Sequence, residues 1–314
     1  MSNEIRIIKY DHSLKSEWNK FVSRSRQQNI IFQRDYIDYH GERFEDCSLL
    51  AFKGSRILGI LPCEISGDSA TSHRGLTFGG WLTPENHSDV GEMEEIMIKS
   101  IDFFKNKGVK KLTYKPVTNI YLTRSADEDK WVISQLGGKI SDITLYWVGE
   151  STKLKKNMRP TMRHELGRDR HSNITISQSN DWNEFYEILA RRLKEKYNSE
   201  PVHSHEEIIR LKNLFPLHIL LYCAYSPEGE MLGGTIVYKS KTVIKTQYIA
   251  TTERGRKEGI IPLILSRVCE DHPDSLYIDM GSSMEGEVLN RSLALNKYLL
   301  GMRPIAGYTM ELTL

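Results

Sequence analysis

The chain of 314 residues lacks the sequence features of several large classes of protein. No stretch approaches the roughly 20 apolar residues of a membrane helix. The amino terminus, MSNEIRIIKY, alternates charged and apolar residues where a secretory signal would be continuously apolar. The four cysteines are scattered and form no CxxC pair, which argues against a disulfide framework. These absences predict a cytoplasmic protein with buried thiols and no membrane span.

The sequence also lacks an excess of charge of one sign. Its net charge of +2 does not indicate nucleic-acid binding, so no DNA partner is expected. A Walker loop, a serine-hydrolase elbow and a Rossmann fingerprint are absent as well. One segment, from Lys153 to Arg170, is strongly basic, and within it Arg163 is expected to contact substrate.

What is present predicts two α/β or α+β domains. The length suits two domains of roughly 150 residues, and helix-period segments alternate with short β-rich runs. The helical periods cover about residues 14–26, 90–107, 153–170, 182–197, 206–214, 260–271 and 288–300. Strand-like ITLYWVG ends at Gly149 just before the basic segment, so we expect domains at 1–150 and 151–314.

The two halves resemble diverged copies of each other. LLAFKGSRILGI, from Leu49, and LYCAYSPEGEMLGG, from Leu221, share an apolar strand, an aromatic residue, a glycine turn and then Leu-Gly. In each half a further strand, a helix and another strand follow. The alternative is that β-hairpins look alike by chance.

The first candidate site is a strand, loop and helix in the second half. The loop TERGRKEG carries Arg254, Arg256 and Lys257 and ends at Gly259, where a helix is predicted to begin. Helix N-termini and guanidinium groups bind phosphate, and glycine lets the backbone approach it closely. The alternative is a solvated basic turn.

The second candidate site follows the strand SLYIDMG. Asp279 stands at the end of this otherwise apolar strand. It is either a structural hydrogen-bond partner or a residue of the site. On the next helix, Asn290 and Lys297 are seven residues apart and share one face. A lysine there can neutralise negative charge that develops on a carbonyl oxygen, or it can be a solvated helix residue.

Together the two sites resemble the GNAT superfamily of acyltransferases. The pyrophosphate motif Q/R-x-x-G-x-G/A is matched from Arg256 through Gly259 and missed at Ile261. The later motif, Asn, then Tyr at plus seven and Gly-Phe, looks like Asn290, Lys297 and Gly301-Met302. With lysine in place of the tyrosine, the segment LNRSLALNKYLLGMR is similar to that of Fem-type aminoacyl transferases. It is also similar to that of FemAB-like, cellulose-biosynthesis-type acetyltransferases of polysaccharide and cell-envelope gene clusters. The resemblance covers most of residues 151–303.

The resemblance implies a tandem pair of GNAT-like domains with mixed sheets and direct acyl transfer without a covalent enzyme intermediate. Acetyl-CoA or another acyl-CoA would be the donor, with its phosphates on Arg254, Arg256 and Gly259. Its amide arm would lie along Gln247, Ile249 and Ala250. Asp279 or His203 would be the base, Lys297 would steady the oxyanion, and Asn290 would bind substrate.

The acceptor would be an amine or hydroxyl of a small, lipid-linked or nucleotide-linked sugar precursor. In the first domain, Trp81 and Tyr114 are candidates for lining its cleft, with core packing as the alternative. His203, in PVHSHEE, is a candidate base, and Ser204 after it a candidate helix N-cap. No metal site is expected there, because no partner cluster is visible.

Two other functions stay open at this point. A Fem-like aminoacyl transferase would take its donor from charged tRNA, with the basic segment along the tRNA backbone. A silent sugar-precursor binding protein would keep the fold and the cleft without catalysis. A monomer and a homodimer are both compatible with the sequence.

Overall fold

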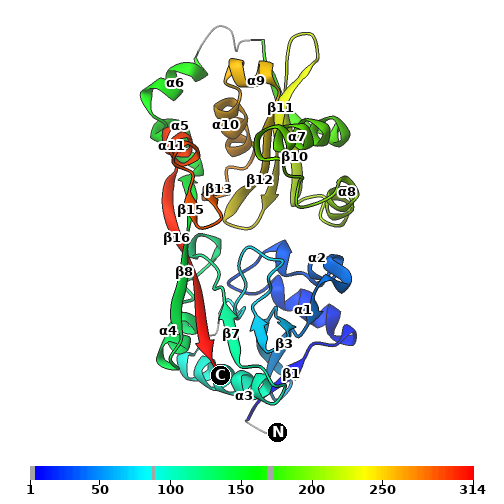
Figure 1. Ribbon diagram of the computed structural model, residues 1–314, viewed down its shortest axis with the longest axis vertical. Helices are drawn as coiled ribbons and strands as arrows, with labels where there is room; N and C mark the ends of the chain where they lie inside the picture. Colours follow the sequence, from blue (N-terminus) through cyan, green and yellow to red (C-terminus); the bar gives the residue numbers. More distant parts are fainter. Residues whose placement is uncertain (1–3, 87–88, 168–172) are drawn as a thin grey trace. The chain divides into compact units, whose positions relative to one another are not determined.

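The computed structural model describes residues 4–86, 89–167 and 173–314 (Figure 1). The chain forms two compact units: unit 1 is Met1–Thr144 with Ala306–Leu314, and unit 2 is Leu145–Ile305. Both are mixed α/β. Among the described residues, no helix is both long and apolar enough to span a bilayer.

Unit 2 is built on a mixed sheet. Strands β9 (Thr175–Ser179), β10 (Ile219–Tyr225), β11 (Met231–Lys239) and β12 (Val243–Thr251) pair antiparallel in the order β9-β10-β11-β12. The predicted meander of three strands joined by the turns SPEGE and SKT is therefore present. Strand β13 (Tyr277–Ser282) adds to β12 in parallel, and the connection between them contains α9 (Glu253–Glu258) and α10 (Ile261–Asp271).

Helices cover both faces of this sheet (Figure 1). Ile264 and Val268 of α10 pack with Tyr222 of β10 on one face. On the other face, Phe185 of α7 (Trp182–Tyr197) lies against Gly234 of β11, so close that a Cβ at Gly234 would stand 3.1 Å from its ring. Alternate residues along each strand thus face helices on opposite sides of the sheet. Helix α8 (His205–Leu214) follows Ser204, which forms the predicted N-cap within a capping box with Glu207.

Strands β12 and β13 pair only at their beginnings. The parallel register runs from Val243 to Lys245 on β12, opposite Tyr277 to Asp279 on β13, while β12 continues to Thr251. A bulge at Gln247 interrupts the pairing of β12 with β11 in the same region. Bulges bend a strand and increase its twist. Beyond Lys245, the side of β12 that faces away from β11 therefore pairs with no strand among the described residues.

Unit 1 also contains an antiparallel hairpin and a later parallel strand pair, but its strands form two separately paired sets. Strands β1 (Ile5–Lys9), β3 (Leu49–Lys53) and β4 (Arg56–Leu61) form an antiparallel sheet with the order β1-β3-β4. A second set consists of β2 (Glu45–Asp46), β5 (Glu64–Ser66), β6 (Ser69–Thr71) and β7 (Lys111–Tyr114). Strands β6 and β7 are parallel and are connected through α3 (Val90–Lys105). The hairpin β3-β4 and this parallel pair correspond to β10-β11 and to the pair β12-β13.

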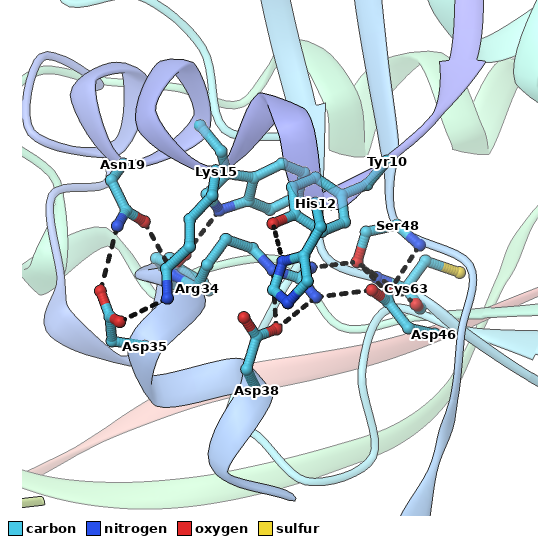
Figure 2. A network of polar contacts seen from close by, with 12 residues as sticks. Tyr10, His12, Lys15, Asn19, Arg34, Asp35, Asp38, Asp46, Ser48 and Cys63 are labelled. Atoms are coloured by element: carbon cyan, nitrogen blue, oxygen red, sulfur yellow. Dashed lines mark hydrogen bonds and ion pairs between the residues drawn. The ribbon is translucent and has the colours of Figure 1, made fainter. Parts of the chain in front are cut away.

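A buried arginine holds the first helices of unit 1 to its sheet (Figure 2). Arg34 of α2 (Arg34–Ile37) is 3% exposed and binds Asp38 and Asp46, each at 2.6 Å. It also donates to Ser48 Oγ at 3.2 Å, and its guanidinium lies 3.8 Å from the centre of the Tyr10 ring. Its Nε donates to Asp38 Oδ1 at 3.0 Å, so all three guanidinium nitrogens have protein partners.

The last strand of the chain returns to unit 1. Strand β16 (Arg303–Thr313) pairs antiparallel with β7 from Met310 to Thr313, and Met310 and Leu312 lie in the core of unit 1. Strand β8 (Lys139–Glu150) is divided between the units after Thr144. The predicted second domain, 151–314, thus differs from unit 2 at its end. The sequence prediction followed chain order, whereas strand pairing joins distant residues.

Most predicted helices are present with shifted ends. The first predicted helix is α1 (Lys15–Val22), and the last is α11 (Arg291–Leu299), because Val288–Leu289 form the short strand β15 with β14 (Met284–Glu285). The basic helix is instead two short pieces, α5 (Leu154–Asn157) and α6 (Pro160–Leu166), since Pro160 cannot continue α5. The rest of that predicted segment, 168–170, lies outside the described residues. Helices α2, α4 (Glu128–Gln135) and α9 were not predicted.

Candidate active site

A cavity of about 720 Å³ lies within unit 2 beside the diverging strands. Its walls come from β12, β13, α6, α7, α9, α10 and α11. Five of the residues predicted from the sequence line it: Gln247, Ile249, Arg256, Gly259 and Lys297. The structure therefore brings the strand of the first predicted site and the helix of the second to one cavity.

Lys297 is the buried charge of this cavity. Its side chain is 5% exposed, and Nζ donates hydrogen bonds to the carbonyl oxygens of Gly281 at 3.1 Å and Ser282 at 2.7 Å. Burial lowers the pKa of Lys297 to about 8, and the nearby carboxylate of Asp279 opposes this shift. An ammonium group has three N–H donors, so one remains for a ligand after each of the two carbonyls has accepted a hydrogen bond.

Asp279 builds the turn that supplies these carbonyls. It is 1% exposed, and its Oδ1 accepts a hydrogen bond from Gly281 N at 2.7 Å. Gly281 has φ +69°, a left-handed conformation that glycine adopts without strain. Asp279 does not line the cavity. The structure thus places it behind Lys297, as a charge partner and a support, and not where a base would meet a substrate.

A second lysine faces the same carboxylate. Lys245 lies opposite Asp279 in the last paired position of β12 and β13. Burial lowers the pKa of Lys245, and Asp279 again opposes the shift. Two amines therefore share the field of one carboxylate at the point where the strands separate, and Lys297 is the one that lines the cavity.

The mouth of the cavity is cationic. Three of its lining residues are exposed lysines or arginines: Lys196 on α7, and Arg256 and Lys257 on α9. Gly259 ends α9 in a left-handed conformation, φ +69°, and α10 begins at Ile261 after this break. Pro262 follows at the start of α10 and has no N–H, so the predicted phosphate site has fewer backbone donors than the motif suggests.

Arg254 differs from its predicted role. Its guanidinium forms ion pairs with Glu228 at 3.0 Å and Glu230 at 2.8 Å, and it does not line the cavity. The reason is that TERGRKE folds as a helix with Thr252 as N-cap, so successive arginines point in different directions. Gly255 allows this helix to lie against β11, because a Cβ there would stand 2.0 Å from Leu232 O.

The predicted residues of β12 divide between two environments. Gln247, in the bulge, and Ile249 line the cavity. Ala250 is 3% exposed, is paired with Gly234 and does not line it. Gln247 and Ile249 therefore face the cavity, together with Thr246 and Thr251 of the same strand, which were not predicted.

His203 is buried outside the cavity lining. It is 5% exposed, and its Nδ1 lies 2.6 Å from the hydroxyl of Tyr248, while its carbonyl oxygen accepts from Tyr186 at 3.0 Å. These contacts fix the loop before α8 against β12 and α7. The described geometry therefore gives His203 a packing role and not access to the cavity.

Asn290 and Arg163 also lie away from this lining. Asn290 is the N-cap of α11, with Oδ1 accepting from Leu293 N at 2.9 Å. It orients the helix that carries Lys297. Arg163 is exposed on α6 and borders a separate hollow against α10.

The two predicted residues of unit 1 are core residues. Tyr114 is 0% and Trp81 1% exposed. The Tyr114 hydroxyl donates to Asp129 Oδ2 and accepts from Trp81 N, both at 2.6 Å. Burial raises the pKa of Asp129 to about 6. The structure thus agrees with the core-packing alternative for these positions.

Several lining residues were missed in the sequence. Arg192 and Lys196 come from α7, and Met280 and Leu293 come from β13 and α11. The first two are four residues apart on a predicted helix, so their shared face was visible, but not what that face would meet. No group of three or more His, Cys, Asp or Glu suited to a metal occurs among the described residues.

No protein-family model and no curated protein sequence matches the chain. Solved structures do match. FemX has a TM-score of 0.70 at 9% identity, over 98% of this chain and 97% of that one. L-PGS from Bacillus licheniformis has a TM-score of 0.58 at 11% identity, over 96% and 91%. A tandem GNAT protein from the clavulanic acid biosynthesis pathway has a TM-score of 0.54 at 12% identity, over 99% and 98%.

At these identities the similarity concerns the fold, and it extends over nearly the whole chain. Each unit contains an antiparallel hairpin and a later parallel strand pair, and in unit 2 the parallel pair is no longer joined beyond Lys245. The chain therefore folds as a tandem pair of GNAT-like α/β units, similar in fold to FemX and to the tandem GNAT protein.

Proposed function

We propose that the protein is an acyltransferase whose reaction takes place in the cavity of unit 2. It would move an acyl group from a CoA-type donor to an amine or hydroxyl. The observation that carries the proposal is Lys297, a buried ammonium oriented by two carbonyls with a third proton left for a ligand. Preorganised donors at a developing oxyanion are among the strongest contributions to catalysis.

In the proposed reaction the acceptor attacks the carbonyl carbon of the thioester. The carbonyl oxygen becomes an oxyanion and accepts a hydrogen bond from Lys297 Nζ. Collapse of this intermediate re-forms the carbonyl and breaks the carbon–sulfur bond, and the proton lost by the acceptor ends on the departing sulfur. With a pKa of about 8, Lys297 is mostly protonated at pH 7 and is close in pKa to a thiol, which favours proton exchange between them.

Two features support a phosphate-bearing donor with an amide-rich arm. Arg256 and Lys196 bring positive charge to the mouth of the cavity, and Lys257 adds to it although it also pairs with Glu253 at 2.9 Å. Past Lys245, β12 is no longer paired with β13, so its backbone can pair with the amides of a pantetheine arm. Gln247 and Ile249 lie along this stretch.

For the acceptor, the proposal follows the resemblance of the sequence. It is an amine or hydroxyl of a sugar precursor used in polysaccharide or cell-envelope synthesis, modified in the cytoplasm. Residues Trp81 and Tyr114 are not part of this proposal, because both are enclosed in the core of unit 1.

The test is Lys297→Met in a thiol-release assay with acetyl-CoA and a panel of amino sugars. Loss of one oxyanion donor lowers kcat by on the order of a hundredfold, with little change in KM. The control is Lys153→Met, an exposed lysine of unit 2 that pairs with Glu150. Full activity of Lys297→Met would remove the catalytic role of α11. Failure of the unaltered protein to bind any acyl-CoA would remove the donor.

A second candidate is transfer of an aminoacyl group from charged tRNA. It is favoured by the basic α5–α6 region, where Lys156, Arg159 and Arg163 are exposed. This candidate predicts binding of tRNA that weakens steeply with salt. Binding of tRNA together with no response to acyl-CoA would favour it over the first.

A further inference from the structure

The lining of the cavity changes in character from its mouth to its interior. The exposed members are Lys196, Arg256, Lys257 and Asn296, of which three are cations. Most of the buried and half-buried lining residues are aliphatic. The exceptions include two cations, Lys297 and Arg192. Among the side chains that the structure describes, the lining contains no aspartate and no glutamate.

Aliphatic side chains flank Lys297. Leu293 and Leu300 stand four residues before and three residues after it, on the same face of α11, and both line the cavity. Met280 precedes the turn whose carbonyls bind Nζ, and it lines the cavity as well. A carbonyl group bound at Nζ would therefore place its substituent against Leu293, Leu300 and Met280.

We propose that the cavity selects an uncharged, aliphatic acyl group and rejects an aminoacyl group. This rests on the proposed function and specifies the donor for the same site. If the carbonyl of an aminoacyl group were bound at Lys297, the ammonium of that group would lie near a second positive charge and among apolar side chains. The described lining offers it no carboxylate. Burial of an unpaired charge is strongly unfavourable, whereas a methyl group of similar size gains from the same surroundings.

The experiment compares two isosteric thioesters, butyryl-CoA and β-alanyl-CoA, which differ in a terminal methyl or ammonium group. Their dissociation constants are measured by calorimetry with the full chain and without acceptor. We expect butyryl-CoA to bind at least about tenfold more tightly. The shared CoA portion cancels in this ratio, so the ratio reports the acyl group alone.

A matched pair of variants tests whether the side chains beside Lys297 cause the preference for butyryl-CoA. Leu293→Glu places a carboxylate beside the acyl position and should reduce the preference for butyryl-CoA about tenfold or invert it. This position is the third of α11, where glutamate is compatible with an N-terminal cap. Leu295→Glu makes the same change two residues on, at a side chain that is 56% exposed and outside the lining, and should leave the ratio unchanged.

The outcomes separate this inference from the proposed function. Equal binding of the two thioesters, or tighter binding of β-alanyl-CoA, overturns the selection and leaves the acyltransferase proposal intact. Loss of the preference in Leu295→Glu as well as in Leu293→Glu overturns the assignment to this cavity. Absence of binding by both thioesters overturns the proposed donor and the inference together.

Discussion

The two units bury charged groups in different ways. In unit 1, Arg34 is enclosed by two carboxylates, a hydroxyl and an aromatic ring, and Arg26 is held by Glu128 and Thr83. In unit 2, Lys297 is equally buried but is held by two uncharged carbonyls and borders a cavity. Similar burial thus accompanies different chemistry, because a saturated charge fixes a fold, and one with a proton to spare can act on a ligand.

The comparison predicts its largest effect at Arg34. Arg34→Met leaves Asp38 and Asp46 without their cation, and loss of one partner of a buried ion pair costs about 3 kcal/mol or more of stability. Urea unfolding of the full chain measures this change. The matched control is Lys15→Met, because Lys15 pairs with Asp35 at the surface (Figure 2) and should cost less than about 1 kcal/mol.

Equal losses in Arg34→Met and Lys15→Met would contradict the structural role of the enclosed arginine. Reduced donor binding by folded Arg34→Met protein would contradict the comparison in another way, since it would assign a ligand function to a saturated charge.

The next effect concerns the pH dependence of stability in unit 1. The pKa of Asp129 is about 6 in the folded protein and 3.8 for a solvated aspartate, so between these values the native state binds more protons than the unfolded state. Stability from this group is therefore greatest at low pH and falls by about 2 kcal/mol as pH rises from 4 to 6. Subtracting the urea-unfolding profile of Asp129→Asn from that of the unaltered protein isolates this contribution. A flat difference profile would refute the assignment.

Sequence periodicity predicted the fold to the extent that local patterns determine it. The meander from β10 to β12, the cap at Ser204 and the core of α10 follow from strand, cap and helix patterns. The place of β16 in unit 1 was not predictable in this way, because Met310 and Leu312 pair with residues almost 200 positions earlier. Long-range pairing leaves no local signal in a single sequence.

For the site, the motif resemblance singled out Lys297, Arg256 and Gly259, and the structure shows that all three line one cavity. The motif did not reveal that Arg254 and Arg256 point in different directions, since this depends on the unpredicted helix α9. Trp81 and Tyr114 were open to two interpretations in sequence, because large aromatic residues occur both in cores and in sugar clefts. Their hydrogen bonds with each other and with Asp129 decide for the core.

The smallest predicted effect concerns the different roles of Arg254 and Arg256 in α9. Arg256 lines the cavity mouth, and among the described residues it forms no ion pair, whereas Arg254 is bound to Glu228 and Glu230. Arg256→Ala should therefore weaken acyl-CoA binding about three- to tenfold at low salt, and the loss should shrink at 0.5 M salt as screening increases. Arg254→Ala removes the same charge two residues away and should leave the dissociation constant unchanged. Calorimetric titration of both variants measures the difference, and a larger loss in Arg254→Ala would show that the donor phosphates lie toward the β10–β11 turn instead of the cavity.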